Sequence, residues 1–158
     1  MSLKINVKGL EDLLDLFEEL KKPIDKDTAI NVGKAVVTEM KDLISKGISP
    51  ILSVGKFPNY KNTAKYPRGQ KPNTPVNLRL TGDFQDALSA RPVAAQAGYG
   101  TEIFYSGKED LKESGHRDGV NKQPKRPTIP QGGEEFAEKV QEVIRDIYDE
   151  RITKLANK

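Results

Sequence analysis

The sequence predicts an α+β domain in which amphipathic helices pack on a small antiparallel sheet that includes a β-hairpin, with long extended loops. Three observations lead to this fold class. Apolar residues repeat at helical spacing in separate segments, two short alternating segments flank a glycine-rich turn, and two other stretches are rich in proline and basic residues. A chain of 158 residues fits one domain, which we expect to span residues 1–158.

Helices are expected near the start of the chain, in its second quarter and at its end. A short alternating lead-in at residues 3–8 precedes the first helix. The second helix begins at Asp25 or Asp27 and stops at Gly47, since glycine commonly ends helices. Thr81 is able to cap a later short helix. The expected helical ranges are 10–20, 25–46, 81–88, 108–114 and 134–156.

The first of these helices has a clear division between apolar and acidic positions. Its apolar positions recur three and four residues apart, as on one face of a helix, and its acids occupy the other positions. The apolar stripe consists of Leu10, Leu13, Leu14, Phe17 and Leu20, and the acids are Glu11, Asp12, Asp15, Glu18 and Glu19.

A β-hairpin is expected after the short helix. Residues 91–97 and 101–106 alternate apolar and polar side chains, as half-buried strands do. Gly98-Tyr99-Gly100 lies between them, and glycine tolerates the positive φ angles of tight turns. We therefore expect the turn of the hairpin at these three residues.

The stretch from Ile48 to Leu80 is expected to be a long basic arm, and residues 115–133 a second basic loop. The arm contains five prolines and no sustained hydrophobic period. A structureless stretch of this length is unusual in a small domain and often orders only against a neighbour. Between Lys56 and Leu80 there are six basic residues and no acid, whereas Glu134–Lys158 carries seven acids against five bases.

Two kinds of partner fit this arm. Its bases alternate with aromatic residues, a pattern that can follow a phosphate backbone while the rings stack on nucleotide bases. The arm equally fits an acidic neighbouring protein, and we favour that partner over direct contact with DNA because the net charge of the chain is only +3. The residues expected to face DNA or a neighbour are Lys56, Lys61, Lys65, Arg68 and Lys71.

The composition argues against several kinds of chemistry. There are no cysteines, so disulfides and thiolate metal sites are excluded. The one histidine, His116, lies near Asp118 in a glycine-flanked segment, where neighbouring side chains point in different directions and do not form an acid–base pair. Scattered acids do not make a metal site, and no phosphate-binding glycine motif is present. We expect no enzymatic activity, no cofactor and no metal, and the longest apolar runs fall far short of the ~20 residues that span a membrane.

Four short segments follow one another in a distinctive order. They are Val7-Lys8-Gly9-Leu10-Glu11-Asp12-Leu13, Leu78-Arg79-Leu80-Thr81-Gly82, His116-Arg117-Asp118-Gly119 and Lys125-Arg126-Pro127-Thr128-Ile129-Pro130. A long helix separates the first two, and the closing helix follows the last. This order resembles the small virion-morphogenesis or tail-completion proteins of long-tailed bacteriophages. The chain differs from that pattern in its long arm and in the polar Thr128, where an aromatic or aliphatic residue is more usual.

The resemblance implies a structural virion protein of the neck or tail end, assembled in the host cytoplasm. Such a protein would be a ring-forming subunit of sixfold-related symmetry that joins the head connector to the tail tube, with connector and tail proteins as neighbours and DNA close by. The alternative is a nucleic-acid-binding protein that grips phosphates with its arm and second loop. The residues expected to make contacts within the subunit or across the ring are Arg79, Thr81, Gly82, His116, Arg126, Pro127 and Ile147.

The energy of ring assembly is expected to come chiefly from apolar contacts. A few aliphatic anchors, at about 25 cal/mol per Å² of buried surface, exceed what exposed ion pairs contribute. A partly exposed stripe on the closing helix would supply them, and it consists of Val140, Ile144, Ile147 and Leu155. The backbone is expected to be rigid at Arg79 and Arg126, so their guanidinium groups are well placed to bind carboxylates.

Overall fold

The computed structural model describes residues 18, 21–59, 76, 78, 82–96, 98–119 and 124–157. Their helices and a two-stranded antiparallel sheet confirm the predicted α+β class. The expected strand at 3–8 and most of the expected helix at 10–20 lie outside the described residues. The elements run α2 (Lys26–Ser45), α3 (Asp83–Asp86), β1 (Leu88–Ala95), β2 (Gly98–Tyr105), α4 (Glu109–Asp118) and α5 (Glu138–Ala156).

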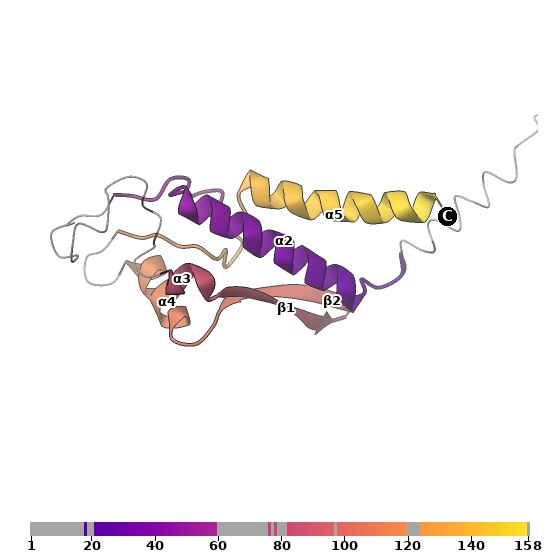
Figure 1. Cartoon of the computed structure of the whole chain (residues 1–158), viewed down its shortest axis with the longest axis horizontal. Helices are drawn as coiled ribbons and strands as arrows, with labels where there is room; N and C mark the ends of the chain where they lie inside the picture. The colour runs from indigo at the N-terminus through magenta and orange to yellow at the C-terminus, as the bar shows by residue number, and fades with distance from the viewer. Residues whose placement is uncertain are drawn as a thin grey trace, which may run out of the picture.

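Helix α2 is the centre of the fold, since it contacts both strands of the hairpin and also α5 (Figure 1). The hairpin, α2 and α5 therefore form three layers, with α2 in the middle. The sequence predicts a buried apolar stripe on this helix, made of Ile30, Val36, Val37, Met40, Leu43 and Ile44. Val36, Met40, Leu43 and Ile44 are buried, whereas Ile30 and Val37 are half-buried. The core continues through Leu88 and Tyr105 of the hairpin to Val140 of α5.

The ends of α2 follow the prediction. Asp25 is the N-cap, and its carboxylate accepts a 2.7 Å hydrogen bond from the Thr28 N–H. That bond, more than any other interaction, lowers the pKa of Asp25. At the other end Gly47, with φ 77°, follows the Lys46 cap as the expected stop.

The turn of the hairpin lies earlier than predicted. Gly98 and Gly100 are part of β2, where they pair with Ala95 and Val93, so the expectation of a turn at these glycines is wrong. Gly98 instead allows two backbone segments to approach each other closely. It bridges to Ile24, and a Cβ on Gly98 would lie 2.5 Å from the Ile24 carbonyl oxygen. This contact ties the entry of α2 to the start of β2.

Several other element ends differ from the predicted ones. Helix α4 continues to Asp118 and ends at Gly119, so four residues assigned to the second loop are helical. Helix α5 starts at Glu138 and not at residue 134. Leu88, expected at the end of a helix, opens β1. In the part of the chain that the structure describes, no helix is long and apolar enough to cross a membrane.

The first part of the predicted arm is built into the fold. Ile51 is fully buried and bridges to Phe136, while Ile48 bridges to Lys56. The N–H of Phe57, whose side chain is buried, donates to the Gly47 carbonyl at 2.8 Å. Residues 48–59 form no helix or strand, in line with the predicted irregular arm, but the side chains of Ile51 and Phe57 are buried, so this part of the arm packs on its own subunit. Residues 60–75 lie outside the described part.

Candidate functional site

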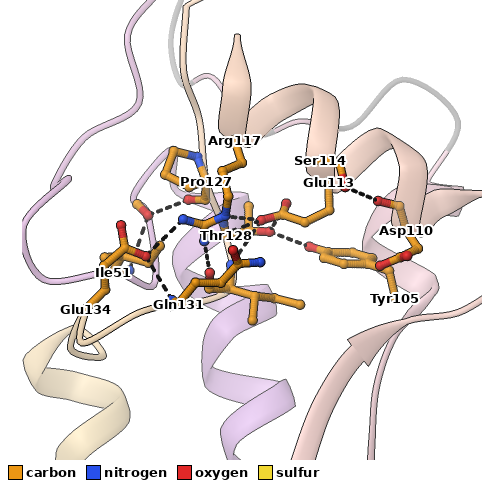
Figure 2. A network of polar contacts seen from close by, with 12 residues as sticks. Ile51, Tyr105, Asp110, Glu113, Ser114, Arg117, Pro127, Thr128, Gln131 and Glu134 are labelled. Carbon is orange, nitrogen blue, oxygen red and sulfur yellow. Dashed lines mark hydrogen bonds and ion pairs between the residues drawn. The ribbon is translucent and has the colours of Figure 1, made fainter. Parts of the chain in front are cut away.

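The most developed polar site of the described fold is a buried network between α4 and the 124–130 segment (Figure 2). The 124–130 segment is extended, and it lies between the last turns of α4 and residues 49–59. On one side of the segment, the Arg126 N–H donates a hydrogen bond to the His116 carbonyl of α4 at 2.7 Å. On its other side the Ser49 hydroxyl donates to the Pro127 carbonyl at 2.7 Å. The segment thus joins two parts of the chain that are distant in sequence.

Glu113 is the centre of the network. This α4 residue is only 4% exposed. One of its oxygens accepts hydrogen bonds from the N–H groups of Thr128, at 3.0 Å, and Ile129, at 3.2 Å. The other oxygen lies 2.5 Å from the Thr128 hydroxyl. Both carboxylate oxygens are therefore engaged by the 124–130 segment.

The direction of the next hydrogen bond follows from this arrangement. The Thr128 hydroxyl has one proton, and it donates that proton to ionised Glu113. The Tyr105 hydroxyl, 3.0 Å from the same threonine oxygen, must then be the donor of its own bond. Tyr105 is buried at the end of β2, and its ring stacks on Phe84 of α3. One chain of hydrogen bonds therefore connects the sheet, the 124–130 segment and α4.

Arg117 extends the network towards the surface. Its guanidinium donates to the Ile129 carbonyl and, at 2.9 Å, to a carboxylate oxygen of Glu134. It also lies 4.0 Å from Glu113, one helical turn earlier. The same Glu134 oxygen accepts from the Gln131 N–H at 2.9 Å. Arg117 thus links the buried carboxylate to an outer one.

The two carboxyl groups are shifted in opposite directions. Burial raises the pKa of Glu113, since the hydrogen bonds to Thr128 and Ile129 and the charge of Arg117 offset the lost hydration only in part. The pKa of Glu134 is lowered, first by the Gln131 N–H and then by Arg117. Burial also raises the pKa of the Tyr105 hydroxyl. Glu113 is thus the carboxyl group of this site whose charge is costly to the fold.

Arg126 makes a second, separate connection. Its side chain is 1% exposed, and its guanidinium donates to the carbonyls of Pro58 and Asn59, both at 2.9 Å. These two bonds go to backbone carbonyls, and the expected carboxylate partner stays a prediction. Arg126 therefore fixes Pro58 and Asn59 to the 124–130 segment.

The predicted contact residues fall into three groups. His116, Arg126 and Pro127 come together in this site, where His116 also meets the Phe84 ring edge-on at 5.1 Å. Gly82 is buried apart from them, as the N-cap of α3 with φ 105°. Arg79 and Thr81 lie outside the described residues, as do Lys61, Lys65, Arg68 and Lys71, while Lys56 is described and exposed.

The predicted apolar stripe of α5 is only partly buried. Val140 is fully buried, so the expectation that it belongs to an exposed interface is wrong. Ile144 and Ile147 pack against the core but are half-buried, as is Leu155, so the expected interface on these three residues stays a prediction. The exposed side of α5 carries more acids than bases, and its exposed bases are Lys139, Arg145 and Lys154. Its exposed acids are Glu138, Glu142, Asp146, Asp149 and Glu150, four of which repeat every four residues.

Sequence reasoning missed the residues that hold the site together. Glu113 was not singled out, Arg117 was only part of a quoted segment and Tyr105 only part of a predicted strand, because the three meet only through tertiary packing. Thr128 did give a signal, since it is polar in a segment where an apolar residue is more usual. Its hydroxyl and N–H both bind Glu113.

The buried network holds the 124–130 segment in place against α4 and the sheet. Both oxygens of Glu113 are taken by donors of the same chain, so the carboxylate presents no free face to a substrate. Among the described residues, no group of three or more metal-ligating side chains is present. Comparisons of the chain with protein-family models, curated proteins and solved structures found no match.

Proposed function

We propose that this chain is a structural subunit of the neck or tail end of a long-tailed bacteriophage, which assembles into a ring and catalyses no reaction. The proposal rests on the order of segments that resembles tail-completion proteins. It is supported by one observation, the contact between two of these segments. The His116 carbonyl accepts from the Arg126 N–H at 2.7 Å, and Glu113 holds Thr128 and Ile129 beside it. The segments thus serve as the subunit's framework.

Ring assembly needs two complementary surfaces on each copy, since a head-to-tail contact is what closes a ring. The acidic outer face of α5 is one candidate. Like charges four residues apart destabilise a helix by about 0.2–0.5 kcal/mol per pair, so this row has a cost in the isolated subunit. The basic residues 61–71 of a neighbouring copy would compensate it. We therefore propose that the arm of one copy docks on α5 of the next.

The experiment is a measurement of native mass by sedimentation, at low and moderate salt. The parent is expected to self-associate. Reversal of two acids on α5, by Glu142→Lys with Asp146→Lys, should abolish association, and Lys61→Glu with Lys65→Glu added should restore it. Asp118→Lys with Glu135→Lys changes the net charge equally and should leave association intact. A monomeric parent, alone and with phage connector or tail proteins, would contradict the proposal.

A nucleic-acid-binding protein is the second candidate. The observation that favours it is that Arg126 binds Pro58 and Asn59, while two bases close to these residues in sequence, Lys56 and Lys125, are exposed. A protein that neutralises several phosphates loses affinity steeply with salt. Gel shift with duplex and single-stranded DNA separates the two functions. Here Lys61→Glu with Lys65→Glu should abolish binding, and the α5 reversal should strengthen it.

A further inference from the structure

A groove lies between the start of α2 and the last turns of α5. Its volume is about 650 Å³, which is within the range of pockets that enclose ligands or several side chains. The apolar part of its lining comes from Pro23, Ile147 and Leu155. Since Ile147 also packs against the core, the groove continues the hydrophobic interior to the surface. Its charged residues are three bases, Lys22, Arg151 and Lys154, and two acids, Asp25 and Glu150.

The N-terminal segment has the matching chemistry. Residues 10–20 combine the apolar stripe of Leu10, Leu13, Leu14, Phe17 and Leu20 with five acids. The stripe fits the apolar lining, and the five acids of the segment fit a lining in which bases outnumber acids by three to two. From these two correspondences we propose that residues 10–20 dock as an amphipathic helix in this groove of their own chain. The proposal does not depend on the function proposed above.

The length of the connection favours docking within one chain. Glu18 and Lys21 are helical, and α2 begins at Lys26. A connection of four residues, 22–25, joins antiparallel helices in many proteins. A helix antiparallel to α2 runs parallel to α5, because α2 and α5 run in opposite directions (Figure 1). A short linker also gives an effective concentration in the millimolar range, which a second copy does not reach.

The dimensions also agree. At 1.5 Å per residue, residues 10–20 form a helix of about 16 Å, and the stretch of α5 from Ile147 to Leu155 is about 12 Å long. In the parallel arrangement Phe17 lies towards the C-terminal end of that stretch. Leu155 is therefore a partner for Phe17, and Asp149, which does not line the groove, is not.

Disulfide trapping tests the contact directly, because the chain has no cysteine of its own. Phe17→Cys with Leu155→Cys is expected to form a disulfide within one chain under mild oxidation. Phe17→Cys with Asp149→Cys is the matched control and should remain reduced. Equal trapping in both pairs would overturn the proposal. Disulfides found only between chains would overturn it as well, in favour of a second copy as the occupant.

Hydrogen exchange supplies a readout that needs no cysteine. In the full-length chain, Phe17→Asp should place a charge in the apolar contact and expose the end of α5. Amides of residues 151–156 should then exchange about tenfold faster, while those of residues 36–44 in α2 keep their rates. Asp12→Ala, a change outside the apolar stripe, is the control and should leave both sets unchanged. Unaltered exchange at residues 151–156 in Phe17→Asp would contradict the docking.

Discussion

Thr128 binds both oxygens of Glu113, with its N–H at 3.0 Å from one and its hydroxyl at 2.5 Å from the other. Through this pair the end of the second loop is fixed to α4, and through the Tyr105 hydroxyl it is fixed to the sheet. The pair is buried and its charge is poorly hydrated, so it should dominate the response of the fold to mutation and to pH.

Thr128→Val should lower the free energy of unfolding by about 1–3 kcal/mol. The valine keeps the shape of the side chain but leaves the Tyr105 hydroxyl and one Glu113 oxygen without their buried partner. Thr38→Val is the control, since the Thr38 hydroxyl bonds only the Lys34 carbonyl on the exposed side of α2. Urea denaturation should show less than about 0.5 kcal/mol for the control. Equal effects of the two substitutions would show that the network adds nothing to stability.

Glu113→Gln should become more stable relative to the parent as pH rises. Burial raises the pKa of Glu113 above its ordinary value of 4.5, so the folded parent binds the proton more tightly than the unfolded chain does. That contribution is complete at low pH and is lost as pH rises through the folded pKa, whereas glutamine does not titrate. Unfolding free energies between about pH 4 and pH 8 measure the difference. A difference that falls with pH would contradict the assignment.

Arg126→Ala should destabilise the fold by about 2–4 kcal/mol, because it removes a buried side chain together with its two charge-assisted hydrogen bonds to the Pro58 and Asn59 carbonyls. Arg126→Lys should cost less, since an ammonium can serve one of the two acceptors. The exchange rate of the Phe57 amide, which bonds the Gly47 carbonyl, should rise in the same order. An Arg126→Ala chain with parental stability would show that the guanidinium is dispensable.

Gly98→Ala should destabilise the fold more than Gly132→Ala. Both glycines have positive φ angles, 110° and 54°, so both substitutions carry backbone strain of about 1–2 kcal/mol. Only at Gly98 would the new Cβ meet backbone, 2.5 Å from the Ile24 carbonyl oxygen, whereas nothing lies within 4 Å at Gly132. The difference between the two melting temperatures reports the close approach together with the extra backbone strain at φ 110°, since 54° lies in the left-handed region that L residues can adopt. Equal shifts would mean that Ile24 moves away without cost.

Local sequence patterns predicted the elements that depend on local physics. The stripe of α2, its cap at Asp25 and its stop at Gly47 were all recognisable, because a helix buries one face and satisfies its own ends. The hairpin was recognised too, but its turn was placed at glycines that serve a contact with Ile24. A glycine has the same appearance in the sequence whether it forms a turn or admits a neighbouring backbone.

Periodicity and composition were enough to establish the α+β class, the extent of α2 and the separation of basic and acidic segments, since these are properties of the chain alone. Three other features emerged only from packing: Ile147 packs partly against the core, Ile51 and Phe57 of the arm are buried, and Arg126 binds backbone carbonyls. Each of these features depends on which residues from distant parts of the sequence pack next to one another. A buried polar group such as Glu113 is stable only when such partners surround it, and no local pattern records them.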